Sequence, residues 1–485
     1  MQKTVILLLG PLIFIVSILM DPIGGMTGYS QIVFGATIWI ALWWVTEIVP
    51  IPVTSLLPIV LFPMTGIMDV KSTTINYGND IVFLYLGGFL IAIAIEKWNL
   101  HRRIALSILL SVGSRLSFII LGFMLATAFL SMWISNTATS VMMLPIGLAI
   151  AGQIEKNDMS GIAIGNGFGK VLMFGIAYGA SIGGLATLIG TPPNLVLVAI
   201  VSELYGIEIN FLDWFILMFP LSVLLLLICW FYLTRFYGVT HKRMTTGSQT
   251  IKEELAKLGK ISYEEKMVAI IFLLTAVGWI TKSILLEKYF SGINDTVIAV
   301  IGGMLMFIVP GKDKKPLMEW KDAIKIPWDI ILLFGGGLAL AEGFKESGLT
   351  MWIGSNFTVL EGASLILVML FLVGAINFLT ELTSNLATTT IILPILAALA
   401  YSMEIHPYGI MVGATLSASC AFMLPVATPP NAVVFSSGLF TIREMAKTGF
   451  VLNLISIILI SLYVYYFMPL VWGIDLFNFP QDFNK

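Results

Sequence analysis

The sequence predicts an all-α polytopic membrane protein that contains two inverted repeats. Of its 485 residues, 58% are hydrophobic and 11% are charged, and the mean hydropathy is +0.96. A water-soluble core cannot hide that much apolar surface. Apolar segments of membrane-spanning length recur along the whole chain, and polar motifs inside them occur twice at a constant separation. The apolar segments therefore predict the membrane, and the duplicated motifs predict the repeats.

About eleven segments match the 17 to 25 apolar residues that cross a hydrocarbon layer of roughly 30 Å. They lie near residues 4–20, 30–48, 51–67, 80–96, 171–201, 214–234, 267–286, 293–310, 327–344, 408–438 and 450–470. The first segment is longer than the apolar part of a signal peptide and has no cleavage site of small residues. We therefore expect it to be retained as a helix.

Two further regions, residues 117–153 and 362–403, are too long for one crossing. In the first region about 13 residues follow the polar tip, whereas a second crossing needs roughly 20. Both regions are predicted to be re-entrant hairpins, which return to the side from which they enter. With a cytoplasmic N-terminus, this arrangement places most of the 26 Lys and Arg residues in cytoplasmic segments, as the positive-inside rule expects. The C-terminus is then extracytoplasmic, and the protein lies in the cell membrane.

The two halves of the sequence resemble each other. DIVFLYLGGFLIA begins at Asp80 and DIILLFGGGLALA begins at Asp329, 249 residues later. SNTATSVMMLP at Ser135 and SNLATTTIILP at Ser384 are separated by the same 249 residues. Because the distribution of basic residues gives the two copies opposite orientations, the repeats are predicted to be inverted. Inverted repeats are typical of secondary transporters, whose substrate sites lie between the repeats.

These features predict a division of the chain into six parts. They are scaffold helices in 1–79, a first repeat in 80–235 with hairpin 117–153 and broken helix 171–201, a cytoplasmic connection in 236–266, scaffold helices in 267–326, a second repeat core in 327–438 with hairpin 362–403 and broken helix 408–438, and a C-terminal helix in 439–485.

Each half also contains a Thr-Pro-Pro-Asn motif, which ends at Asn194 and at Asn431. A Pro-Pro pair removes two amide donors and interrupts a helix. Interrupted backbone inside a membrane is tolerated only where protein, water or a ligand supplies hydrogen-bond partners. The two breaks and the two hairpin tips therefore predict one composite binding site.

The chemistry of that site favours an anion and a small cation. Helix N-termini present unpaired N–H groups and suit carboxylates, whereas carbonyl, hydroxyl and amide oxygens suit Na⁺. No Lys or Arg occurs in the four motifs. A doubly negative substrate would then depend on helix dipoles and on bound cations for charge compensation, which is a physical cause for coupling the two.

The motifs also resemble those of a known family, the divalent anion/sodium symporters, which include sodium-dependent dicarboxylate and citrate carriers. The resemblance covers nearly the whole chain. It rests on the two Ser-Asn tips, on ASIGGLATLIGTPPN from Ala180, on AFMLPVATPPN from Ala421 and on WWVTEIVPIPVTSLLPIVLFP from Trp43. It implies eleven transmembrane helices, two re-entrant hairpins, a homodimer and an elevator-type transporter with Na⁺ as the coupling ion and no organic cofactor.

The resemblance further implies roles for individual residues. The substrate carboxylates would contact Ser135, Asn136, Thr137, Thr191, Pro192, Ser384, Asn385, Thr428 and Pro429. One sodium ion would bind Ser131, Ser135, Asn136 and Gly190, and another would bind Thr380, Thr383, Asn385 and Ala427. The sequence departs from the family at Leu386, where Thr is usual, and this removes a hydroxyl donor from the second tip.

Structural explanations compete with these roles. Ser, Thr and Asn in membrane helices often bond only to neighbouring backbone, but their recurrence beside both Thr-Pro-Pro-Asn motifs favours a site. The glycines of the GG motifs, such as Gly87 and Gly336, are interpreted as helix-packing or hinge positions. Glu381 could tune cation binding or hold the structure together, and Glu47 could lie at an aqueous helix end.

The sequence therefore predicts sodium-coupled symport of C4 dicarboxylates such as succinate, malate or fumarate, and not an enzyme. A sodium-independent dicarboxylate exchanger, for example for 2-oxoglutarate and malate, is the first alternative. A citrate or sulfate carrier, an ion channel and a proton antiporter are further alternatives, but the paired motifs contain no acidic pair that could carry protons. A membrane hydrolase is disfavoured because the sequence shows no nucleophile–base motif or metal-ligand spacing.

Overall fold

The computed structural model describes residues 2–113, 115–156, 165–239, 245–356 and 363–484, and the elements of this described part are helical. The first half contains α1 (Gln2–Leu19), α2 (Gly28–Thr46), α3 (Ile51–Thr54), α4 (Leu57–Thr65), α5 (Val70–Ile75), η1 (Asn76–Gly78), α6 (Asp80–Lys97), α7 (Leu100–Ser111), α8 (Leu116–Ser131), α9 (Asn136–Lys156), α10 (Gly165–Gly184), α11 (Pro192–Tyr205) and α12 (Phe211–Phe236).

The second half begins with the connecting helix and ends near the C-terminus. It contains α13 (Thr245–Lys257), α14 (Tyr263–Thr281), the π-helical turn η2 (Lys282–Leu286), α15 (Glu287–Tyr289), α16 (Asp295–Ile308), α17 (Trp320–Ala323), α18 (Trp328–Ser347), α19 (Leu349–Asn356), α20 (Leu365–Thr380), α21 (Asn385–Ser402), α22 (Pro407–Ala418), α23 (Pro429–Phe435), α24 (Ile442–Tyr466), α25 (Met468–Trp472) and η4 (Gln481–Asn484).

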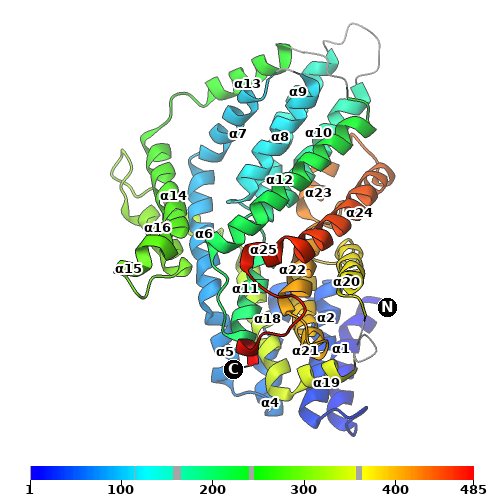
Figure 1. Cartoon of the computed structure of the whole chain (residues 1–485). Coiled ribbons are helices and arrows are strands. Elements are labelled where there is room, and N and C mark those ends of the chain that lie inside the picture. The colour runs from blue at the N-terminus through cyan, green and yellow to red at the C-terminus, as the bar shows by residue number, and fades with distance from the viewer. Residues whose placement is uncertain (1, 114, 157–164, 240–244, 357–362, 485) are drawn as a thin grey trace.

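The helices of the two halves follow the same order. The run from α6 to α12 corresponds to the run from α18 to α24: a long helix, a short helix, a hairpin, a broken helix and a closing helix. In Figure 1, α7, α8 and α9 lie at the top of the molecule, whereas α18, α19 and α21 lie in its lower part. The sequence repeat is therefore also a structural repeat.

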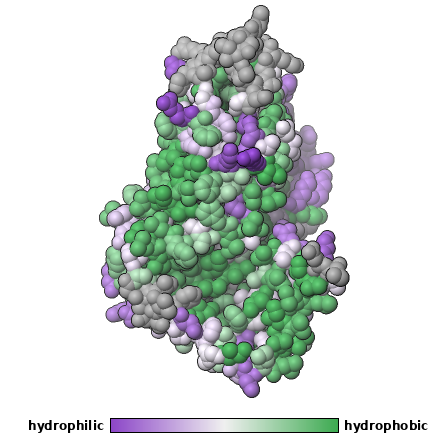
Figure 2. All heavy atoms as spheres, turned by 90° about the vertical axis from the view of Figure 1, so that its right-hand side faces the viewer, coloured by the Kyte–Doolittle hydropathy of each residue, from purple (hydrophilic) through white to green (hydrophobic). Residues whose placement is uncertain are grey.

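Apolar side chains cover the outside of this helical assembly. Among the described residues, seven helices are long and apolar enough to cross a membrane, and α1, α8, α11, α16 and α20 belong to shorter apolar helices. Figure 2 shows a broad hydrophobic area over the middle of one face, with hydrophilic residues towards the ends and flanks. A membrane-spanning fold is thus confirmed, while the count of eleven spans and the re-entry of the hairpins remain predictions.

Two expectations about segment length differ from the structure. The expectation that about 13 residues follow the first tip is wrong, because α9 has 21 residues. It continues through Pro145 and beyond the apolar stretch, since α10 and α13 pack on it and supply contacts that lipid would not. The expected span 51–67 is divided into α3 and α4, each of which has a proline in its first turn.

Glycines permit close helix packing at the two positions that the GG motifs mark. A Cβ atom on Gly87 of α6 would overlap the backbone of Ala299 in α16, and one on Gly336 of α18 would overlap the backbone of Ser55. The packing role predicted for these glycines is confirmed.

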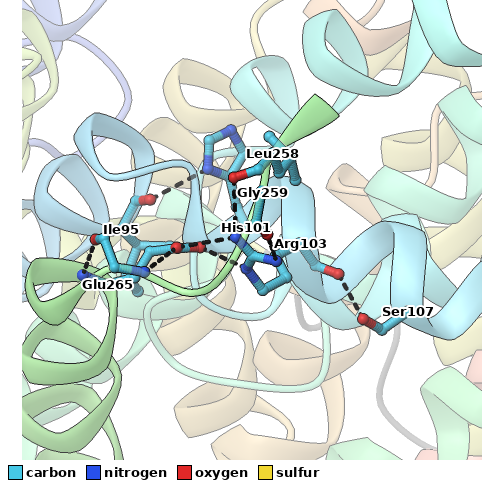
Figure 3. Close-up of polar contacts among 8 residues, drawn as sticks. Ile95, His101, Arg103, Ser107, Leu258, Gly259 and Glu265 are labelled. Carbon is cyan, nitrogen blue, oxygen red and sulfur yellow. Dashed lines mark hydrogen bonds and ion pairs between the residues drawn. The ribbon is translucent and has the colours of Figure 1, made fainter. Parts of the chain in front are cut away.

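The connection between the halves is fixed to α7 by Arg103. Its guanidinium donates to both carboxylate oxygens of Glu265, at 2.8 and 3.1 Å, and to the carbonyl of Gly259 at 3.1 Å (Figure 3). Glu265 also accepts from the Ser262 N–H at 3.0 Å in the capping box of α14. On the other side of α13, Thr250 hydrogen-bonds Gln153 of α9. The connection 236–266 therefore contains a helix that joins α7 to the first hairpin.

Candidate substrate and cation site

The two hairpin tips and the two helix breaks meet at one cavity of about 650 Å³. It is bounded by the loop before α9, the loop before α21, and the starts of α11 and α23. All nine residues that the resemblance assigns to substrate lie in its wall: Ser135, Asn136, Thr137, Thr191, Pro192, Ser384, Asn385, Thr428 and Pro429. The structure thus brings together residues from both halves of the chain.

Beneath the second tip lies a cluster of oxygen atoms. The Thr380 hydroxyl oxygen is 2.6 Å from Asn385 Oδ1 and 2.9 Å from the carbonyl oxygen of Ala418. A hydroxyl has one hydrogen and can donate to only one of these two acceptors. Three oxygen atoms thus lie close together with one hydrogen among them. Such oxygens are hard ligands, which small cations such as Na⁺ prefer, so these residues fit a sodium ion.

The first tip holds the equivalent residues, but its amide is turned the other way. Ser131 contacts the Asn136 amide, and its hydroxyl donates to the carbonyl of Ala180 at 2.7 Å. With its amide nitrogen turned inward, Asn136 donates to the carbonyls of Ala180 and Gly190, both at 3.3 Å. Gly184 packs against this amide, and a Cβ atom on Gly184 would approach its terminal atoms to 2.8 and 3.2 Å.

The remaining predicted sodium ligands divide into two groups. Gly190, Thr383 and Ala427 line the cavity, whereas Ser131 and Thr380 are completely buried behind it. The Thr383 hydroxyl donates to the Leu379 carbonyl at 2.9 Å and lies 2.5 Å from the Thr388 hydroxyl. The hydroxyl hydrogen is thus engaged by a neighbour, whereas its oxygen, which has two lone pairs, keeps capacity for a cation.

The carbonyls of Ala180 and Ala418 were not among the residues predicted from the sequence. They belong to helices 49 and 38 residues away from Ser131 and Thr380. Nothing in an alanine's identity indicates that its carbonyl oxygen is near a site. The sequence does contain one indirect signal. The two Thr-Pro-Pro-Asn motifs are 237 residues apart, and adding 237 to Ala180 gives Ser417, the neighbour of Ala418, so the repeat distance relates the two carbonyls to each other.

The asparagines of the Thr-Pro-Pro-Asn motifs hold the breaks in shape. Asn194 Nδ2 donates to the carbonyls of Gly184 and Thr187 at 3.1 and 2.8 Å. Asn431 Nδ2 donates to the carbonyls of Ala421 and Leu424 at 3.1 and 3.0 Å. Each amide therefore bridges two carbonyls of its break, one of which, that of Thr187 or Leu424, also accepts from a backbone N–H of the same break.

Glu381 fixes the second break from the hairpin side. Its carboxylate accepts from the N–H groups of Phe422, Met423 and Leu424 at 2.8, 2.9 and 3.0 Å. It also accepts from Asn453 Nδ2 of α24 at 2.7 Å. Glu381 is 3% exposed and is absent from the cavity wall. Of its two predicted roles, the structure supports the structural one.

The first half uses different atoms at the equivalent place. Met132 occupies the position of Glu381, and its backbone carbonyl accepts from the Thr187 hydroxyl at 2.5 Å. The two halves thus share a backbone geometry but not the side chains that stabilise it.

The charge of the cavity wall is negative. Among the described residues that line it, none is Lys or Arg, and the carboxyl groups belong to Glu47 and Asp329. Glu47 caps the C-terminus of α2 with φ 48°, a left-handed conformation that costs energy for a residue with a side chain. It is exposed, as expected for an aqueous helix end. An anion in this cavity would need positive compensation from helix N-termini and cations.

The two tips differ in polarity. Thr137 and Leu386 occupy equivalent positions and both line the cavity. Leu386 is 7% exposed and places methyl groups where the first tip has a hydroxyl.

Membrane-spanning helices arranged around a polar cavity at paired helix breaks define a multi-pass membrane protein with the architecture of a secondary transporter. Residues 2–473 match the family model described as the sodium:sulfate symporter transmembrane region, and the chain belongs to this family.

Named relatives agree with that assignment. The sodium-dependent dicarboxylate transporter SdcS of Staphylococcus saprophyticus is 44% identical over 479 residues, which cover 97% of this chain and 92% of the relative. The protein of the same name from Staphylococcus aureus strain USA300 is 46% identical over 480 residues, with the same coverage of both chains.

Among solved structures, Neisseria gonorrhoeae MtrF, described as one of a class of antimetabolite efflux pumps, has a TM-score of 0.55 at 12% identity, with 83% of this chain and 84% of that chain covered. The Alcanivorax borkumensis YdaH transporter has the same TM-score and identity, with 81% and 85% covered. At this identity the two structures support the fold alone.

Proposed function

We propose that the protein is a secondary active transporter that carries C4 dicarboxylates, such as succinate, malate or fumarate, together with sodium ions. The observation that carries this proposal is the single cavity in which both Ser-Asn tips and both Thr-Pro-Pro-Asn breaks converge. The names of the relatives support the choice of dicarboxylate and of sodium.

In this proposal the residues of each half bind a substrate carboxylate and a sodium ion. Ser135, Asn136 and Thr137 on one side, and Ser384 and Asn385 on the other, bind the two carboxylates of the substrate. The starts of α11 and α23, at Thr191–Pro192 and Thr428–Pro429, complete the pocket.

The cations would bind directly behind the tips. One site would use Ser131, Ser135, Asn136 and Gly190 and the other Thr380, Thr383, Asn385 and Ala427. Since Asn136 and Asn385 belong to both kinds of site, the binding of a cation would fix the amide that meets the anion. In a cavity whose carboxyl groups are Glu47 and Asp329, the cations also reduce the repulsion that a dianion meets.

Movement of the site between the two sides of the membrane is the second part of the proposal. The first tip is packed: Trp133 lies against Phe211 and Phe272, with ring centroids 6.1 and 4.9 Å apart. Its counterpart at the second tip, Leu382, is 72% exposed, and Val426 beside it is 81% exposed. Inverted repeats exchange such roles between conformations. The opposite state would therefore bury Leu382 and Val426, in an elevator-like movement of a homodimer with cytoplasmic N-termini.

The test is uptake of radiolabelled succinate into proteoliposomes with and without a sodium gradient. Sodium-driven uptake is expected, and the separate variants Asn136→Ala and Asn385→Ala should abolish it while leaving the oligomeric state in detergent unchanged. Uptake that requires internal dicarboxylate and ignores sodium would instead establish an exchanger. Competition by malate, 2-oxoglutarate, citrate and sulfate would define the substrate range.

A further inference from the structure

The first turn of α12 contacts a buried ion pair outside the cavity, which we call the socket. The socket consists of Lys282 in η2 and Asp295 at the start of α16, which are 3% and 8% exposed. Lys282 Nζ lies 3.3 Å from Asp295 Oδ1 and 3.8 Å from the more exposed Glu287. Buried charges persist only with good partners, so the socket is an ion pair whose remaining hydrogen-bonding capacity must be satisfied.

Both charged side chains of the socket use further hydrogen bonds to hold the N-terminus of α12. Asp295 Oδ2 accepts from the backbone N–H of Phe211 at 2.7 Å, and Lys282 Nζ donates to Asn210 Oδ1 at 2.5 Å. A carboxylate at a helix N-terminus also interacts favourably with the helix dipole. The Phe211 ring stacks on Trp279 of α14 with centroids 4.7 Å apart, and the Trp279 indole donates to the Asp295 carbonyl at 3.0 Å.

The opposite side of the same turn contacts the transport site. Trp214 Nε1 donates to the carbonyl of Leu185, in the break between α10 and α11, at 3.0 Å. Phe211 also stacks on Trp133, which lines the cavity. One helical turn therefore joins the first break and the first tip to the socket.

The two sides of this contact belong to different packing groups. α12 packs along α10 and contacts α8 and α24, and Ser222 of α12 donates to the Ile182 carbonyl at 2.8 Å. α14 and α16 instead pack on each other and on α6, and they lie together at the left of Figure 1. Lys282 and Asp295 both lie in the second group, so their ion pair stays intact if α12 leaves. Departure would break the two hydrogen bonds to Phe211 N–H and Asn210 and the ring contact between Phe211 and Trp279, while each charge of the socket keeps its partner, which makes the contact releasable.

We propose that Lys282 and Asp295 are positioning residues that form a latch: they hold the first turn of α12, and with it the substrate site, in the conformation described above. The proposal rests on the proposed function, since it requires that the site moves. Release of the latch would accompany movement to the opposite conformation, in which Val426 becomes buried.

The experiment measures the population of this conformation by the labelling rate of a Val426→Cys reporter with a hydrophilic thiol reagent, without substrate. The two natural cysteines, Cys229 and Cys420, are buried and give little background. The double variant Lys282→Met/Asp295→Asn removes the charges without leaving one unpaired, and Asn210→Ala removes one latch contact with the ion pair retained. Both should slow labelling, roughly threefold to tenfold for the double variant and less for Asn210→Ala.

Lys288→Met is the matched control, because it removes an exposed Lys from the same region and should leave the labelling rate unchanged. Sodium-dependent succinate binding, measured calorimetrically in detergent on each variant, separates the two proposals. If the parent protein binds no succinate in the presence of sodium, the proposed function fails. If Asn210→Ala and every folded socket variant bind succinate and label at the parent rate, the latch is refuted. Slower labelling with succinate binding retained supports it, and Asn210→Ala decides the question if the double variant does not fold.

Discussion

Replacing Glu381 by Gln tests how the second half of the site is held together. Glu381 Oε1 accepts from Phe422 N–H, Met423 N–H and Asn453 Nδ2, and Oε2 accepts from Leu424 N–H. A glutamine of the same shape can keep its oxygen at the first position. Its NH₂ group then faces the Leu424 N–H, so that two donors meet and one backbone N–H loses its partner.

The expected cost follows from those contacts. Hydrogen bonds to a charged group contribute about 1.5–3 kcal/mol each, and a buried donor without a partner costs about 1–3 kcal/mol. Losing one such bond and weakening three others should lower the free energy of unfolding by about 3 kcal/mol, allowing for non-additivity. Because the same segment leads to Ala427 and Thr428, sodium and succinate should also bind more weakly.

Two measurements check this reasoning. Thermal unfolding in detergent should show a lower midpoint for Glu381→Gln, and calorimetric titration should show reduced sodium affinity. Asn453→Ala is the graded comparison: it removes one donor and leaves the carboxylate with three backbone partners, so both effects should be smaller. A Glu381→Gln protein with the midpoint and sodium affinity of the parent would show that the carboxylate does not hold the break.

Three further predictions concern other parts of the structure. Leu386→Thr restores a hydroxyl at the position equivalent to Thr137 and should tighten dicarboxylate binding by about 1 kcal/mol. Unchanged dicarboxylate affinities in a competition series would show that a hydroxyl at the second tip does not contribute to substrate binding. Asn431→Ala removes two hydrogen bonds to break carbonyls and should cost about 2 kcal/mol of stability, whereas Asn431→Asp, which sets a carboxylate against those carbonyls, should cost more; the reverse order of unfolding midpoints would contradict the assigned contacts. Arg103→Lys cannot reproduce the paired bonds to Glu265 and should lower stability by about 1 kcal/mol, with sodium-driven uptake retained; a midpoint equal to that of the parent would show that the guanidinium is dispensable.

The connecting helix also has a defined response to pH. Hydrogen bonding to Lys257, together with the nearby charge of Arg102, lowers the pKa of Glu254 below its ordinary value. A lowered carboxyl pKa contributes stability above the unfolded-state pKa, and this contribution is lost only as the pH falls through the lowered value. Attachment of α13 through Glu254 should therefore be constant across neutral pH and should weaken only in strong acid, which limited proteolysis of the 236–266 connection at graded pH can measure.

Some parts of the site are predictable from the sequence, and the reason is local. The Ser-Asn tips and the Thr-Pro-Pro-Asn breaks are short motifs whose residues interrupt helices by themselves, so their positions in the chain indicate where backbone must find other partners. All nine predicted substrate residues indeed lie in one cavity wall. Their binding roles remain predictions. The length of α9 exceeds the expectation because an apolar run gives the minimum extent of a helix, not its end.

By itself the sequence determined that the chain is a membrane protein, that it consists of two related halves, and which segments interrupt their helices. Composition and motif spacing carry that information, since each depends only on neighbouring residues or on a repeat distance. Only the tertiary structure decided that Glu381 holds the amides of Phe422 to Leu424, and that the Asp295 carboxylate receives the first turn of α12, 84 residues earlier in the chain. Such contacts join residues that are distant in sequence, and they depend on the packing of whole helices, which no local pattern specifies.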